Sequence, residues 1–141
     1  MKFFNLDCHI SVISDIKNIL ENLGHQVDSW SLSGHRWVLN LPECKSPVIN
    51  ADNWKNINQE MVDKFYETHR QELDKYDAFI CAYPPIFLKL FEQFNKPILV
   101  ISATRYDFPV AGDKNRLAWL EDSLKNNSNI IKIANNQFDQ K

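Results

Sequence analysis

The hydrophobic residues of this chain follow two spacings, one typical of strands and one typical of helices. Short apolar or alternating runs predict strands at residues 2–6, 25–32, 77–83, 98–102 and 129–134. Apolar residues that recur every three or four positions predict helices at residues 11–23, 57–75, 86–94 and 113–125. The chain is therefore expected to alternate between strands and helices along most of its length.

Glycine and proline residues set the expected boundaries of these elements. Gly24 follows the first helical pattern directly and predicts its end, and Pro84 with Pro85 stops the strand at residues 77–83 and suits the first turn of the next helix. Residues 33–56 show no sustained periodicity and predict a long irregular loop, in which a short helix or strand remains an alternative.

Alternating strands and helices favour a parallel sheet, because parallel neighbours need a crossover connection and right-handed crossovers place helices on both faces. The expected fold class is α/β, a Rossmann-like doubly wound sheet of about five parallel strands with helices on both faces. The length of 141 residues fits one domain spanning residues 1–141.

Composition and charge narrow the partners that we expect. Sixteen Lys and Arg residues against 18 Asp and Glu residues give a net charge of −2, and the basic residues are scattered, so no nucleic-acid partner is expected. The three cysteines, Cys8, Cys44 and Cys81, match no disulfide or zinc-ribbon spacing, which favours reduced thiols and a cytoplasmic location. No apolar run approaches the roughly 20 residues of a transmembrane segment.

Candidate chemistry lies after the strands, because ligands of open α/β sheets bind outside the carboxyl ends of the strands. After the first predicted strand, His9 beside Asp7 has the residue types of a general base held by a carboxylate, and Asp7 is itself a candidate base. A histidine that caps the following helix is the structural alternative. Ser11 lies in the first helical turn, where it can cap the helix or help to bind an anion.

The loops after the later strands carry further candidates for ligand binding. The segment after the second strand consists of Ser33, Gly34, His35, Arg36 and Trp37. It combines a flexible glycine with two potential cations and an indole, which together can bind a polyol. The alternative is a turn whose aromatic residue folds onto the core. Tyr83 follows the third strand and lines the same crevice or packs beneath Pro84. Arg105 follows the fourth strand and can bind a carboxylate or phosphate, or form a salt bridge with a nearby aspartate.

Several kinds of site are excluded by the absence of their motifs. Only three glycines are present, Gly24, Gly34 and Gly112, so neither a G-x-G-x-x-G turn nor a P-loop can form, and no cofactor is expected. The four histidines include no pair at helical ligand spacing, so no metal site is expected.

These residues together resemble a known family, the N-terminal, acceptor-side domain of GT-B glycosyltransferases. The resemblance rests on five segments spread along nearly the whole chain, at residues 7–11, 23–27, 76–81, 96–100 and 129–135. It implies a sugar or glycan acceptor as the ligand, with His9 or Asp7 as the base that deprotonates its hydroxyl group. The residues that would line the acceptor side are Ser33 to Trp37, Tyr83 and Arg105.

The resemblance also implies what this stretch of sequence lacks. A GT-B enzyme binds its nucleotide-sugar donor in a second domain, and no donor-binding motif occurs in these residues. The chain is then the N-terminal half of a two-domain enzyme, or it works with a partner chain, and it is expected to be inactive alone. The alternative is a non-enzymatic α/β module that binds a small ligand or another protein.

Overall fold

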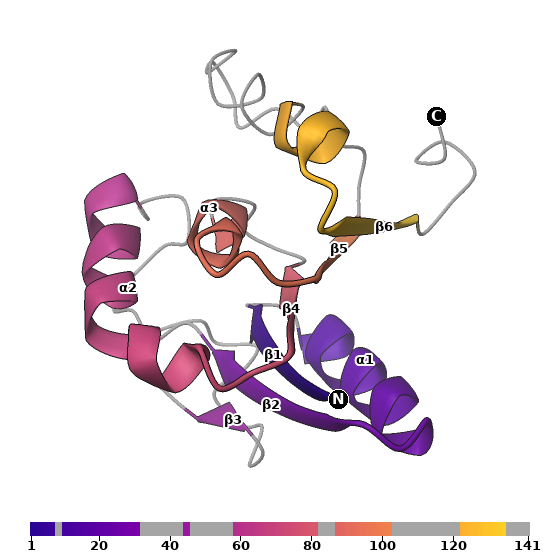
Figure 1. Cartoon of the computed structure of the whole chain (residues 1–141). Helices are drawn as coiled ribbons and strands as arrows, with labels where there is room; N and C mark the ends of the chain where they lie inside the picture. The colour runs from indigo at the N-terminus through magenta and orange to yellow at the C-terminus, as the bar shows by residue number, and fades with distance from the viewer. Residues whose placement is uncertain (8–9, 32–43, 46–57, 82–86, 103–121, 135–141) are drawn as a thin grey trace.

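The computed structural model describes residues 1–7, 10–31, 44–45, 58–81, 87–102 and 122–134 of the chain. Its strands are β1 (Lys2–Asp7), β2 (Gln26–Ser31), β3 (Cys44–Lys45), β4 (Ala78–Cys81), β5 (Ile98–Ser102) and β6 (Ile130–Ala134). Its helices are α1 (Ile10–Asn22), α2 (Gln59–Leu73) and α3 (Phe87–Glu92), and residues 122–126 form a further helical turn before β6. Figure 1 shows their arrangement.

The strands form one six-stranded sheet in the order β3-β2-β1-β4-β5-β6, and every neighbouring pair is parallel. The chain first moves from β1 outward to β3, then crosses back to β4 and moves outward in the other direction. Strand order therefore reverses between β1 and β4. This is the doubly wound α/β architecture that the alternation of elements predicts.

The short strand β3 matches the alternative left open for residues 33–56, a short helix or strand within the long loop. β3 lies inside the segment expected to be irregular, where Cys44 pairs with Ser29 and Lys45 pairs with Trp30. A strand of two residues is too short to produce an alternating pattern, so only its pairing with β2 reveals it.

The ends of two helices have local chemical causes. Gly24 adopts a positive φ of 89° after α1, and its N–H and that of His25 donate to the carbonyls of Glu21 and Leu20, both at 3.0 Å. These two bonds form a Schellman motif, which confirms the predicted glycine stop. At the start of α2, the side chain of Asn58 accepts a hydrogen bond from the backbone N–H of Met61 at 3.0 Å.

The helices cover the two faces of the sheet differently. α2 and α3 pack on one face, which we call the aromatic face (Figure 1). Its buried aromatic residues are Phe4, Trp30, Phe65, Tyr76, Phe79, Phe87 and Phe91. α1 packs on the opposite face, which we call the α1 face, through Ile16 and Leu20. The buried apolar residues of the α1 face are Phe3, Val27, Ala78, Ile80 and Ile101.

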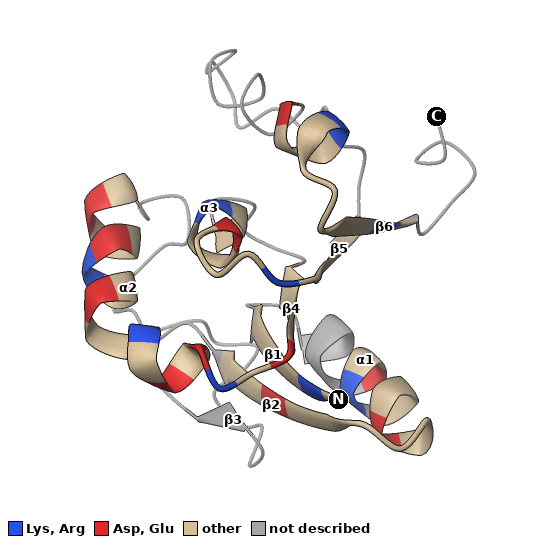
Figure 2. Cartoon of the chain, in the orientation of Figure 1, with Lys and Arg blue, Asp and Glu red and all other residues tan. Residues whose placement is uncertain are grey.

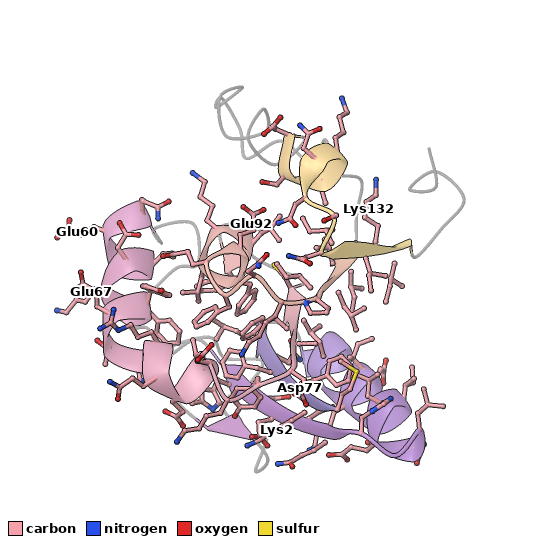
Figure 3. The ribbon with its side chains drawn as sticks, viewed as in Figure 1. Lys2, Glu60, Glu67, Asp77, Glu92 and Lys132 are labelled. Atoms are coloured by element: carbon pink, nitrogen blue, oxygen red, sulfur yellow. The ribbon has the colours of Figure 1, made fainter. Side chains whose placement is uncertain are left out.

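Charged residues lie mainly on the outer surfaces of the described elements. Figure 2 shows acidic and basic residues along α2, and Figure 3 shows Glu60 and Glu67 pointing from that helix away from the sheet. The strands between the helices carry few charges, as expected for a sheet buried on both faces.

Candidate functional site

The carboxyl ends of the strands meet at one edge of the sheet. Asp7 at the end of β1 pairs with Ser31 at the end of β2, and Leu6 pairs with Cys81 at the end of β4. Helix α1 begins at Ile10, immediately beyond this edge. The reversal of strand order between β1 and β4 therefore lies beside the start of a 13-residue helix, which is where open α/β sheets bind ligands.

Two of the residues predicted from the sequence belong to described elements. Asp7 is the last residue of β1, and Ser11 is the second residue of α1. Both therefore lie at the carboxyl edge, next to the reversal of strand order, as the sequence predicts.

The other predicted site residues lie outside the described residues, and their roles stay predictions. They are His9, Ser33, Gly34, His35, Arg36, Trp37, Tyr83 and Arg105. The strands that precede these residues in the sequence, β1, β2, β4 and β5, all end at the carboxyl edge of the sheet. This is the basis for expecting the residues to gather there.

Sequence reasoning missed two buried polar residues below this edge. Asn5 and Ser29 face each other in the register of β1 and β2, with 0% and 3% of their surfaces exposed. Both amide atoms of Asn5 and the hydroxyl of Ser29 lack a hydrogen-bond partner. Each buried unpaired group costs about 1–3 kcal/mol. A polar residue within the apolar run at residues 3–6 was the available sequence signal.

A hollow of about 320 Å³ opens beside β2 and reaches Ser29. Its lining consists of Lys17, Val27, Asp28, Ser29, Trp30, Glu72 and Tyr76. The ammonium group of Lys17 is 2.6 Å from Glu21 Oε1 and donates to the backbone carbonyl of Val27 at 3.2 Å. This lysine therefore satisfies a backbone acceptor of β2.

The opposite, amino edge of the sheet is held by polar contacts that are satisfied within the chain. Tyr76 donates from its hydroxyl to Asp28 Oδ2 at 2.6 Å, and the ammonium group of Lys2 lies 4.8 Å from the centre of the Tyr76 ring. The backbone N–H of Lys2 donates to Asp77 Oδ2 at 2.7 Å. Burial, and then the neighbouring Asp28 carboxylate, raise the pKa of Tyr76 well above its usual value. These contacts stabilise the fold at this edge, where Asp28 and Tyr76 also line the hollow.

The described residues also limit the other kinds of site. Within the described ranges, no three His, Cys, Asp or Glu residues gather closely enough to hold a metal ion. A helix with the length and apolar character needed to span a bilayer is likewise absent from the part of the chain that the structure describes.

Comparisons with protein-family models, with curated proteins and with solved structures find no match to this chain.

Proposed function

We propose that this chain is the acceptor-binding domain of a GT-B glycosyltransferase, which transfers a sugar from a nucleotide-sugar to a hydroxyl acceptor. The observation that carries the proposal is the reversal of strand order between β1 and β4 beside the start of α1. This crevice is the position at which sheets of this kind bind small ligands. The resemblance in sequence supplies the class of ligand, a sugar or glycan.

The proposed reaction assigns a proton-transfer role to the residues after β1. His9 or Asp7 takes the proton of the acceptor hydroxyl, the acceptor oxygen bonds to the anomeric carbon of the donor sugar, and the nucleoside diphosphate leaves with the electrons of the broken bond. The residues after β2, β4 and β5 would hold the acceptor, among them Trp37, Tyr83 and Arg105. A second domain or a partner chain would bind the nucleotide-sugar.

The proposed location is the cytoplasm. The support is the spacing of Cys8, Cys44 and Cys81 in the sequence, which matches no disulfide framework. Disulfides are rare in reducing compartments.

A transfer assay on the native protein tests this proposal. The native polypeptide that carries this sequence, with any chain that copurifies, is incubated with UDP-glucose, UDP-N-acetylglucosamine or GDP-mannose and a panel of glycosides. We expect transfer to at least one glycoside, and a loss of about 100-fold or more for His9→Ala. His25→Ala is the matched control, because His25 lies at the amino edge against Phe3. Absence of transfer with every donor, or equal rates for the two variants, would contradict the proposal.

A second candidate function is a non-enzymatic module that binds a small ligand or another protein. Ile131 and Ile133 on β6 favour it, because they are 52% and 38% exposed and neighbour Leu99 and Ile101 in the register of β5. An exposed apolar strip of this kind is typical of an interaction surface. Under this alternative, Ile133→Lys would reduce copurification of a partner, and His9→Ala would change no transfer activity.

A further inference from the structure

One part of the α1 face is apolar and open to solvent. Ile131 and Ile133 of β6 are 52% and 38% exposed, and they pair in register with Leu99 and Ile101 of β5. Leu99 and Ile101 belong to the apolar cluster of the α1 face, and partners in register point to the same face of a sheet. Leu99, Ile131 and Ile133 therefore form an apolar strip on the α1 face, which we call the β6 strip.

The described helices leave the β6 strip uncovered. α1 packs mainly on β1 and β2, whereas β5 and β6 lie beyond β4 in the strand order. α2, α3 and the helical turn before β6 all contribute to the cluster on the aromatic face, the last through Leu124. Figure 1 shows α1 alongside β1 and β2, with α2 and α3 on the opposite side of the sheet. No described helix therefore packs over β6 on the α1 face.

The side of α1 that faces β6 carries an apolar residue and an acidic residue. Lys17 points toward β2, because its ammonium group donates to the carbonyl of Val27. Asp15 and Ile19 each lie two positions from Lys17, which is about 200° of helical rotation, so both are on the opposite side of the helix. That side looks along the sheet toward β4, β5 and β6. Ile19 is 55% exposed, and Asp15 is exposed as well.

We infer that the β6 strip is the centre of a symmetric dimer, in which it packs face to face on the same strip of a second copy of this chain. The strip is apolar, so a two-fold axis through its centre makes one surface the partner of itself. Two sheets packed in this way stand about 10 Å apart and bury the side chains between them. The inference is independent of the proposed function, and it differs from the second candidate function because it names the partner.

The same two-fold axis brings α1 of each copy beside β6 of the other copy. A helix is about 10 Å across, so a second sheet packed about 10 Å above β6 lies in the same layer as α1. The side of α1 with Asp15 and Ile19 then faces the partner's β6, which is the last strand of the described sheet. Ile19 adds apolar area to the contact. Asp15 meets an opposite charge, since β6 carries the exposed Lys132 between its two exposed isoleucines.

The size of the strip indicates that the dimer is weak. β5 and β6 are each five residues long, so together they cover an area of about 16 by 10 Å. Stable interfaces bury about 800 Å² on each partner. We therefore expect a dissociation constant on the order of 100 µM. The net charge of −2 opposes association only weakly.

Analytical ultracentrifugation of the full chain, from about 10 µM to about 1 mM, tests this inference. Ile131→Lys and Ile133→Lys place a charge in the strip, and Gln93→Lys is the matched control because Gln93 is exposed just after α3. We expect the wild-type protein and Gln93→Lys to dimerise alike, and the dissociation constant to rise at least tenfold in each strip variant. On dilution of 15N-labelled protein, amide shifts should be confined to α1, β5 and β6, with α2 unmoved.

Charge reversal is a second test that keeps the strip intact. Asp15→Lys and Lys132→Asp should each weaken the dimer about threefold, and the double variant should restore the wild-type affinity. A double variant that binds no more tightly than the single variants would contradict the position of α1 beside the partner's β6.

Two results would overturn the dimer itself. A wild-type protein that stays monomeric up to about 1 mM would do so, and the strip would then be left to residues 135–141 or to another protein. A dimer that both isoleucine variants leave unchanged, or whose dilution shifts centre on α2, would place the interface elsewhere and would equally overturn the inference.

Discussion

The two faces of the sheet are built from different residues, and substitutions on them are expected to change stability in different directions. On the aromatic face, Phe4 packs edge-on against Trp30 with ring centres 5.0 Å apart, and Phe79 stacks on Phe91 at 4.8 Å. On the α1 face the buried side chains are fewer, and two polar residues without partners interrupt them. The comparison indicates that the aromatic face supplies most of the stability, while the α1 face, next to the reversal of strand order, accepts unpaired polar groups that a purely structural core would exclude.

The largest expected effect is on the aromatic face. Phe4→Ala removes a fully buried ring that contacts Trp30, Tyr76, Phe79 and Phe91, and should reduce the free energy of unfolding by about 3–5 kcal/mol. Urea denaturation followed by tryptophan fluorescence measures it. Leu23→Ala is the control, because Leu23 is 69% exposed and should change stability by less than about 0.5 kcal/mol. Similar losses for the two variants would contradict this assignment of the core.

A substitution on the α1 face is expected to increase the stability of the fold instead of reducing it. Asn5→Val replaces an amide without hydrogen bonds by an apolar side chain, and should raise the free energy of unfolding by about 1–2 kcal/mol. The same urea denaturation measures the change. A loss of stability would show that the amide is satisfied within the fold, and the contrast between the two faces would then disappear.

A smaller effect is expected at the amino edge. Tyr76→Phe removes the hydrogen bond to Asp28 and keeps the ring, so it should reduce the free energy of unfolding by about 1 kcal/mol at neutral pH. The half-exposed Asp28 carboxylate can bind water instead, which limits the loss. A loss as large as that of Phe4→Ala would show that this contact, rather than the aromatic packing, holds the sheet to α2.

The same tyrosine predicts a pH dependence. Folding raises the pKa of Tyr76, so the folded state holds the phenol proton more tightly than the unfolded state, in which the pKa is about 10. The stabilisation is complete below about pH 10 and is lost as the pH rises toward the folded-state pKa. Urea midpoints at pH 8 and pH 11 should therefore differ more for the wild-type protein than for Tyr76→Phe. Equal differences would contradict this role of Tyr76.

Much of the fold was predictable because its signals are local. The apolar run that forms β4, the glycine after α1 and the spacing of apolar residues in α2 each depend on neighbouring residues, and the structure confirms the elements they predict. The sequence allowed a short strand within residues 33–56 but could not place β3, because its two residues become a strand only through pairing with β2. Strand order is likewise a tertiary property that no single segment encodes.

The location of the candidate site could be predicted from the sequence, but not all of the residues that lie near it. The carboxyl-edge rule placed Asp7 and Ser11 beside the start of α1 without knowledge of the strand order. Asn5 was overlooked because a single polar residue in an apolar strand is common and does not by itself indicate a site. Its significance depends on its burial and on its neighbour Ser29 in another strand, and both are known only from the fold.

A map of backbone amide shifts on the full chain, recorded during titration with methyl glycosides, tests whether the carboxyl edge binds a sugar. We expect shifts concentrated at the carboxyl edge, at Asp7, Ile10, Ser31 and Cys81, while the amino-edge amides of Lys2, Gln26 and Asp77 stay unmoved. Shifts centred on the amino edge, or no shifts with any glycoside, would contradict the assignment of this edge as a sugar-binding site.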